Sequence, residues 1–377
     1  MTTRRSRVLH LVTRYRQGGS EQRVRDFVAA LPDADHTVVV GADSDAALAR
    51  VELCQPVEVM AELVRSPHPD HDLRAIAAVR ARLKRDDIDV VITHQSKAGV
   101  VGRIAARSLG RRSRVPVVHS LSMASFGPGY GRAESAIFCT LERILGPMTA
   151  RYVVVGADLA RRFEVAGIAS NTLTIVRSGA TLPGPRPAEP PPVPGVPDGR
   201  KVIVSLGALE DRKNPLDLVP LLQRVRATVP DAFLAVAGDG PRRADLEAAV
   251  QAAGLNDDVA LLGYVKPVES LLWRADALVL LSNAEGLPQV LIQAAAAGVP
   301  LVTYDVDGGR EVVGLGAVGT VVPLGDVVGA ADAVTRMLTE HAAGIPTVDL
   351  SSWNPEVIRS SYRAVVDAVL TERRRAG

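Results

Sequence analysis

The stretch ALVLLSNAEGLPQVLIQAAAAGVPLVTY, residues 277–304, has the pattern of a strand, a helix and a second strand. The apolar runs Ala277–Leu281 and Pro300–Tyr304 are short and bounded by turn residues, as buried strands are. The Ala- and Leu-rich segment between them has helical composition, and Pro288 suits the first turn of a helix. Strands joined through a helix run parallel, so this stretch predicts a parallel sheet covered by helices.

The same alternation of apolar runs and helical segments extends through the chain. The other predicted strands are Arg7–Thr13, His36–Gly41, Val90–His94, Val115–His119, Arg151–Val155 and Thr172–Val176 in the first half, and Val202–Leu206, Ala232–Ala237, Val259–Leu262 and Gly319–Val322 in the second. The pattern predicts an α/β protein with two Rossmann-like, doubly wound parallel-sheet domains that face each other across a cleft.

A proline-rich segment marks the boundary between the two halves. Residues 181–200, TLPGPRPAEPPPVPGVPDGR, contain eight prolines, which favour an extended and semi-rigid linker. We therefore expect an N-terminal domain over residues 1–180 and a C-terminal domain over residues 201–350. Residues 351–377 are predicted to form a terminal helix.

Composition excludes several classes of protein. The 44 basic and 42 acidic residues nearly balance, which argues against a nucleic-acid binder. Two cysteines cannot make a disulfide scaffold or a zinc ribbon, and they suit a reducing compartment. No apolar stretch reaches the length needed to span a bilayer. These features lead us to expect a cytoplasmic protein, whose oligomeric state the sequence leaves open.

Charge is shared unevenly between the halves. Residues 1–180 carry 26 basic and 18 acidic residues (net +8), leaving 18 basic and 24 acidic (net −6) for the remainder. This asymmetry reflects either chance placement on solvated helices or attraction of an anionic acceptor or membrane by the first half. The basic segment Leu73–Arg85 is likewise either a solvated helix or a peripheral contact with an anionic membrane.

Two connections after predicted strands carry residues suited to phosphate. Gly18 and Gly19 lie between the first strand and a helical segment, where backbone amides and the helix N-terminus favour an anion. A plain turn is the alternative. Arg212 and Lys213 follow the strand Val202–Leu206 and have the charge to bind a diphosphate. Solvated loop charges have the same pattern.

Glu285 begins the most informative segment. It follows a buried strand, and the backbone amides of Gly286, Leu287 and Gln289 would point from the start of the next helix toward a ligand. Gln293 comes about two helical turns after Glu285. The two side chains would hold different parts of one ligand. Alternatively, Glu285 is a helix N-terminal charge and Gln293 a satisfied buried amide.

The order of short motifs along the chain resembles one enzyme family. The motifs are Gly-Gly-Ser-Glu, the proline-rich linker, Gly-x-Leu-x-x-x-Lys-Asn, Gly-Asp-Gly-Pro, Gly-Tyr-Val, Glu-Gly-Leu-Pro and Ala-x-Gly-Val-Pro. In this order they look like the retaining GT-B glycosyltransferases of family 4, from about Val8 to Trp353. The segments 90–99 and 116–120 also resemble the acceptor side of that family. The terminal helix resembles the one that crosses back to the first domain.

The resemblance implies a nucleotide-diphosphate sugar, expected to be UDP-linked, bound mainly by the second domain, with no metal and no other cofactor. By position it implies catalytic roles for His119 and Glu285, phosphate contacts from Gly18, Gly19, Arg212 and Lys213, sugar contacts from Gly286, Leu287, Pro288 and Gln289, base and ribose contacts from Gly263, Tyr264, Val265 and Gln293, and acceptor-side positions for Glu21, Lys97 and Ser120.

Three positions depart from the family pattern. Ala208 stands where the family usually has an arginine, and Arg212 is the expected substitute. Gln293 replaces a second glutamate, so ribose hydroxyls would meet an amide oxygen instead of a carboxylate. Ser178 replaces an asparagine in the turn between the domains. These departures bear on the identity of the donor and on the level of activity.

The expected reaction transfers a hexosyl or N-acetylhexosaminyl group, with retention, to a hydroxyl of a glycan, a lipid-linked sugar or a small natural product. Asp33-Ala-Asp35 and Asp305-Val-Asp307 lack a metal-binding context, so leaving-group charge would fall to Arg212 and Lys213. The alternatives are an inactive sugar-nucleotide-binding regulator and a sugar-nucleotide 2-epimerase. Residues 123–132 are either a mobile acceptor loop or a plain surface loop.

Overall fold

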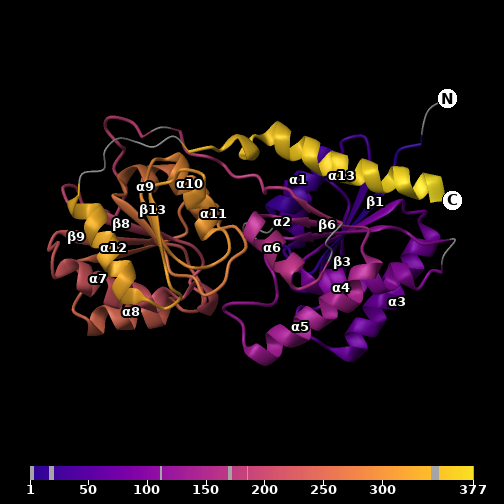
Figure 1. The fold of residues 1–377 in the computed structure, drawn as a ribbon, viewed down its shortest axis with the longest axis horizontal. Helices are drawn as coiled ribbons and strands as arrows, with labels where there is room; N and C mark the ends of the chain where they lie inside the picture. The colour runs from indigo at the N-terminus through magenta and orange to yellow at the C-terminus, as the bar shows by residue number, and fades with distance from the viewer. Residues whose placement is uncertain are drawn as a thin grey trace. The chain divides into compact units, whose positions relative to one another are not determined.

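The computed structural model describes residues 4–16, 21–110, 113–168, 172–184, 186–340 and 348–376. The chain divides into two compact units (Figure 1). The first unit comprises Met1–Gly179 together with Ser351–Gly377, and the second comprises Ala180–Leu350. Residues 180–200 therefore belong to the second unit, where the Trp273 Nε1 donates to the Gly184 carbonyl at 3.1 Å.

The first unit contains a seven-stranded sheet in the order β3-β2-β1-β4-β5-β6-β7. Every pairing between its strands is parallel, in a continuous register such as Val8 opposite both His36 and Val90. Its strands are β1 (Arg7–Val12), β2 (Asp35–Gly41), β3 (Val57–Met60), β4 (Val90–His94), β5 (Val117–Leu121), β6 (Arg151–Val154) and β7 (Leu173–Ile175). The sequence had not predicted β3, a short edge strand whose VEVM sequence alternates and leaves Val59 half exposed.

The second unit contains a six-stranded sheet in the order β10-β9-β8-β11-β12-β13, also parallel throughout. Its strands are β8 (Lys201–Leu206), β9 (Ala232–Ala237), β10 (Val259–Gly263), β11 (Ala277–Leu280), β12 (Leu301–Tyr304) and β13 (Gly319–Val322). Two doubly wound parallel sheets confirm the predicted fold class.

Helices connect successive strands in both units. The first unit has α1 (Gln22–Ala30), α2 (Ala46–Leu53), α3 (Pro69–Arg85), α4 (Ser96–Arg107), α5 (Arg132–Leu145), α6 (Ala157–Val165) and α13 (Pro355–Ala376). The second has α7 (Leu218–Arg226), α8 (Arg243–Ala252), α9 (Glu269–Arg274), α10 (Gln289–Ala296), α11 (Gly309–Gly314) and α12 (Val327–Thr339). Helix α10 begins after Pro288, so this proline precedes the helix instead of lying in its first turn.

Helix α13 belongs to the first unit because of what it buries. Ile358, Tyr362 and Val366 are buried in one cluster with Phe27 of α1 and strand residues of β1 and β4. The rings of Phe27 and Tyr362 lie 4.1 Å apart between centroids. Each such side chain contributes roughly 1.5–3 kcal/mol on burial. The long helix therefore lies along the first unit, although it follows the second in sequence (Figure 1).

Each sheet reverses its winding direction at one pair of neighbouring strands. These pairs are β1 and β4 in the first unit, and β8 and β11 in the second. In open parallel sheets, ligands bind at the carboxyl ends of the strands where the winding reverses. The loops that follow these four strands are therefore the expected positions of a ligand site. Over the described residues, no helix is both long and apolar enough to cross a bilayer.

Candidate active site

The winding reversal of the second unit brings Lys213 and Glu285 together. Lys213 ends the 3₁₀ turn Asp211–Lys213 after β8, and Glu285 lies between β11 and α10. The Lys213 Nζ lies 2.5 Å from the Glu285 Oε1, and the Arg212 Nη1 lies 3.2 Å from the same oxygen. Lys213 and Glu285 are 72 positions apart in sequence, and they meet because β8 and β11 are adjacent.

Glu285 is an ionised carboxylate whose side chain is almost completely buried. Its side chain is 8% exposed and that of Lys213 is 17% exposed. Burial raises the pKa of the carboxyl group, but Lys213 and Arg212 outweigh it and hold the pKa below its usual value. A lysine ammonium has three donors, and Glu285 takes one of those of Lys213. The cluster is therefore able to accept a further anion such as a phosphate.

Arg212 is clamped beside this pair. Its Nη1 donates to the Ala284 carbonyl at 3.1 Å, and its Nη2 donates to the Glu210 Oε1 at 2.7 Å. The backbone N–H of Asn283 donates to the Arg212 carbonyl at 2.8 Å, which ties the loop after β11 to the loop after β8. Position 208, where the family usually has an arginine, is an alanine in this chain. Arg212 therefore supplies the second cation next to Lys213. Its phosphate role remains a prediction.

Glycines let the loops after β8 and β9 approach each other. Gly238 has a φ of +146°, and a Cβ there would lie 1.8 Å from the Gly207 carbonyl oxygen. The Gly238 amide donates to the Gly263 carbonyl at 2.7 Å, which joins the ends of β9 and β10. A small hollow opens beside these loops. Its lining is Ser205, Leu206, Gly207, Ala208, Leu209, Lys213, Pro215, Leu218, Leu280 and Leu281.

The segment between Glu285 and α10 packs against a second tight turn. Gly286, Leu287 and Pro288 are buried, while Gln289 opens the helix and is partly exposed. Gly308 has a φ of +85°, and a Cβ there would lie 2.8 Å from side-chain atoms of both Leu287 and Pro288. The need for glycine at position 308 was not predicted, because it depends on a contact between distant loops.

The residues predicted to contact the base and the ribose lie on two different segments of the second unit. Gly263, Tyr264 and Val265 follow β10, and the Tyr264 side chain is 62% exposed. Gln293 lies on α10, and its Nε2 donates to the Thr181 carbonyl at 3.1 Å. Its amide group is thus held by the segment that enters the second unit, and its ribose role stays a prediction.

In the first unit, Gly18 and Gly19 lie outside the described residues. The loop that leads to them is held by Gln95, whose Oε1 accepts from the Arg14 amide and whose Nε2 donates to the Arg14 carbonyl, both at 3.0 Å. Glu21 is buried just before α1, where its Oε1 accepts from the Arg16 amide at 3.3 Å.

Two predicted acceptor-side residues have partners inside the first unit. The Lys97 Nζ lies 2.6 and 2.7 Å from the two carboxylate oxygens of Asp72. The buried Ser120 hydroxyl accepts from the Arg23 Nε at 3.0 Å. Arg23 is itself fully buried and also donates to the carbonyls of Val153 and Val176. An arginine on the buried face of α1 gives no sequence signal for this role.

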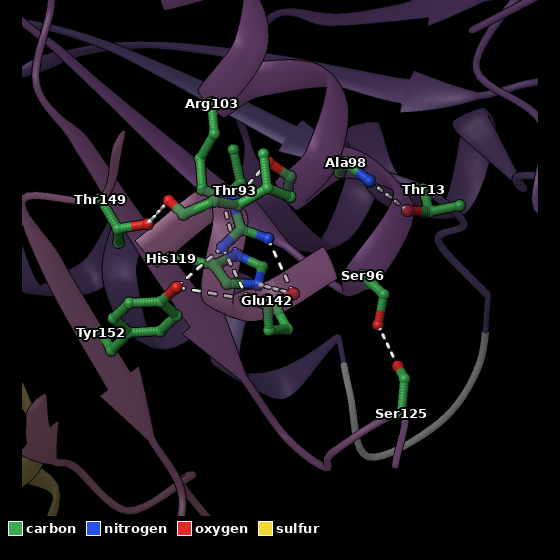
Figure 2. A network of polar contacts seen from close by, with 12 residues as sticks. Thr13, Thr93, Ser96, Ala98, Arg103, His119, Ser125, Glu142, Thr149 and Tyr152 are labelled. Carbon is green, nitrogen blue, oxygen red and sulfur yellow. Dashed lines mark hydrogen bonds and ion pairs between the residues drawn. The ribbon is translucent and has the colours of Figure 1, made fainter. Parts of the chain in front are cut away.

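His119 lies inside a buried network that Figure 2 shows. Its Nδ1 lies 2.8 Å from the Thr93 hydroxyl, and its Nε2 lies 4.0 Å from the Glu142 Oε1. Glu142 accepts from Arg103 at 2.7 and 2.8 Å, and the Arg103 Nη1 also donates to the Tyr152 hydroxyl at 2.9 Å. Arg103 and Glu142 thus form a buried bidentate ion pair between α4 and α5.

Burial, followed by repulsion from Arg103, lowers the pKa of His119 to about 3, so the ring is neutral. The ring is fully buried, and it fits only because position 99 is glycine: a Cβ there would lie 2.2 Å from its Cε1. Thr93 holds the ring at Nδ1, while Arg103 and Glu142 lie near it, and none of the three was predicted. The catalytic role that the resemblance gives to His119 is not visible in this enclosed arrangement and stays a prediction.

Comparison with known proteins identifies the class. The family model for glycosyl transferases group 1 matches residues 189–344, and the glycosyl transferase 4-like domain matches residues 18–179. An Escherichia coli UDP-Gal:alpha-D-GlcNAc-diphosphoundecaprenol alpha-1,3-galactosyltransferase is 25% identical over 73% of this chain and 72% of its own length. The 2-deoxystreptamine N-acetyl-D-glucosaminyltransferase of Streptomyces fradiae is 37% identical over 40% of this chain and 39% of its own.

Solved structures share the fold. The Anabaena protein HepE in complex with UDP superposes with a TM-score of 0.68 at 18% identity, over 98% of both chains. Sucrose-phosphate synthase from Thermosynechococcus elongatus gives a TM-score of 0.72 at 17% identity, again over 98% of both. The two sheets have the GT-B fold, and the two family models identify the chain as a glycosyltransferase. The chain belongs to family 4, the glycosyl transferases group 1, whose members use nucleotide sugars.

Proposed function

We propose that this chain is a retaining hexosyltransferase that takes its sugar from a UDP-linked donor bound by the second unit. The observation that carries the proposal is the cluster of Arg212, Lys213 and Glu285 at the ends of β8 and β11. It combines two cations suited to a diphosphate with a carboxylate suited to sugar hydroxyls. The choice of UDP is supported by the name of the Escherichia coli relative and by the UDP complex of HepE.

Donor binding would exchange partners within this cluster. In the free protein the Lys213 ammonium neutralises Glu285. A diphosphate would take over Lys213 and Arg212, and Glu285 would then accept hydrogen bonds from the hydroxyls of the transferred sugar. Since Glu285 is nearly buried, an unpaired charge there is costly. The site therefore favours a ligand that brings phosphate and hydroxyl groups together.

Transfer would follow from the same arrangement. The bond between the anomeric carbon and the β-phosphate oxygen breaks, and the acceptor hydroxyl oxygen bonds to that carbon on the same face. The hydroxyl proton passes to the departing phosphate oxygen. Lys213, Arg212 and the backbone amides before α10 stabilise the developing negative charge. We propose that these groups do so without a divalent ion.

The acceptor is a hydroxyl group of a glycan, a lipid-linked sugar or a small natural product, bound by the first unit. The names of two relatives support the lipid-linked and the small-molecule acceptor: one contains a diphosphoundecaprenol and the other 2-deoxystreptamine. The positive balance of residues 1–180 favours an acceptor that carries negative charge.

The test is to incubate the purified protein with UDP-, GDP- and dTDP-linked hexoses and N-acetylhexosamines, with and without EDTA. We expect slow hydrolysis or transfer from a UDP-sugar that persists in EDTA, with an α-linked donor giving an α-linked product by proton NMR. An inverted product would exclude retention, and loss of activity in EDTA would exclude metal independence. Binding without turnover would favour the regulator, and release of a 2-epimer would favour the epimerase.

Matched variants connect the activity to the cluster. Glu285→Gln keeps the shape of the side chain and removes its charge, so it should abolish transfer while the protein stays folded. Lys201→Met removes a more exposed lysine of the same unit, 3.8 Å from Asp276, and should leave activity unchanged. Full activity in Glu285→Gln would contradict the proposed contact between Glu285 and the hydroxyls of the transferred sugar.

A further inference from the structure

A hollow in the first unit lies between α5, α6 and the loop that follows β5. Its lining is Phe126, Gly127, Tyr130, Arg132, Ser135, Ala136, Cys139, Arg143, Arg162, Val165 and Ala166. Its volume is about 500 Å³, and it is open to solvent. The loop begins at the carboxyl end of β5, the edge where open parallel sheets bind ligands. The hollow extends from that loop to the last residue of α6.

Hydrogen bonds hold the loop against both helices. The Gly127 amide donates to the Ser135 hydroxyl of α5 at 2.8 Å, and the Arg162 Nη1 of α6 donates to the Phe126 carbonyl at 3.3 Å. The Tyr130 hydroxyl donates to the Ala124 carbonyl at 2.9 Å. Residues 123–132 are thus anchored at several points, so the floor of the hollow is formed before any ligand arrives.

The charge of the hollow has one sign. Its lining contains three arginines and no acidic residue. Within the described ranges, neither Arg132 nor Arg143 forms an ion pair, and both side chains are exposed. The Arg143 Nε donates to the Ala166 carbonyl at 2.7 Å, which fixes the guanidinium and leaves its other donors for a ligand. Guanidinium groups in this setting match phosphate.

Part of the lining beside these arginines is apolar. It includes Phe126 and Ala166, and Val165, the last residue of α6, is 81% exposed. The inner face of α5 is fixed by the buried Glu142, which pairs with Arg103 (Figure 2). Apolar lining residues beside Arg132 and Arg143 suit a molecule in which a phosphate adjoins a hydrocarbon chain.

We propose that this hollow, the α5–α6 groove, binds the phosphate and the first part of the hydrocarbon chain of a lipid carrier to which the acceptor sugar is attached. Arg132 and Arg143 bind the phosphate, and Phe126, Val165 and Ala166 contact the hydrocarbon chain of the lipid. The sugar of such an acceptor would then extend toward the carboxyl edge of the sheet. This inference rests on the proposed function and names its acceptor class as an isoprenoid or lipid phosphate.

The test measures binding of farnesyl diphosphate to the full chain by calorimetry, with saturating UDP present to occupy the donor site. Two compounds serve as comparisons: farnesol lacks the phosphate groups, and inorganic diphosphate lacks the hydrocarbon chain. We expect the farnesyl probe to bind at least tenfold more tightly than either. The double variant Arg132→Gln/Arg143→Gln and the single variant Val165→Asp should each weaken it at least tenfold. The matched control Arg107→Gln removes an exposed arginine of α4 and should leave it unchanged.

Several results would overturn the proposal. Equal binding of inorganic diphosphate would show a site for free phosphate only. Unchanged affinity in the double variant would place the probe elsewhere. Binding to vesicles of anionic phospholipid, with no binding of monomeric probe, would show a membrane contact instead of a carrier site. UDP binding by the same variants separates this test from the proposed function: Lys213→Met should lose UDP and keep the farnesyl probe, and the double variant should do the reverse.

Discussion

Replacing Lys213 with methionine tests the central pair of the candidate active site. Methionine keeps most of the aliphatic stem and removes only the charge that lies 2.5 Å from Glu285. Breaking a buried ion pair by removing one partner costs roughly 3–5 kcal/mol. Arg212 remains 3.2 Å from the carboxylate and compensates in part. We therefore expect the second unit to lose about 2 kcal/mol, about a thirtyfold change in its unfolding equilibrium.

The two tryptophans allow each unit to be followed separately. Trp273 lies in the second unit and Trp353 in the first. In a Trp353→Phe background, urea unfolding followed by tryptophan fluorescence reports on the second unit alone. UDP affinity, measured by calorimetry on the same proteins, should fall at least tenfold in Lys213→Met, because one of the two phosphate cations is gone.

A double variant separates charge from packing. Lys213→Met/Glu285→Gln leaves no unpaired carboxylate, so its stability should return to within about 1 kcal/mol of the parent while UDP binding stays weak. If the double variant is as unstable as Lys213→Met, the loss comes from packing and the electrostatic reasoning fails. Unchanged stability and unchanged UDP affinity in Lys213→Met would refute the assignment of the cluster altogether.

Three further predictions concern buried groups. The pKa values of His94 and His119 are lowered to about 3, chiefly by burial, so the unfolded chain binds more protons than the folded chain between about pH 6.5 and 3. As the pH is lowered through that window, the first unit should lose up to about 1.4 kcal/mol of stability per pH unit for each ring. Urea unfolding at a series of pH values measures this loss, and a stability that does not change with pH would contradict burial of neutral rings. Gly99→Ala should destabilise the first unit by about 1–3 kcal/mol, because its Cβ would overlap the His119 ring. The control Gly146→Ala should have little effect, because nothing lies within 4 Å of a Cβ at that position. Equal melting temperatures of the two variants would show that the ring can move aside. Gly238→Ala should lower both UDP affinity and the stability of the second unit, since a Cβ would overlap a backbone carbonyl of the neighbouring loop, and wild-type values in both assays would contradict the close approach.

The sequence predicted the architecture because buried parallel strands are continuous apolar runs. Twelve runs were expected, and each corresponds to a strand whose ends agree within two residues. Strand β3 was missed because its residues alternate and its edge position leaves side chains exposed. The start of α10 was placed too early, since Pro288 is compatible both with the first turn of a helix and with the residue before it.

The sequence alone also determined which residue types follow the strands, and so identified Arg212, Lys213 and Glu285 as candidates. Tertiary structure decided which of these residues meet. Lys213 and Glu285 form a pair because strand order makes β8 and β11 neighbours. The enclosure of His119 and the α5–α6 groove likewise depend on contacts between residues far apart in the chain. Periodicity and turn chemistry are local properties, whereas burial and charge pairing arise only when distant segments pack together.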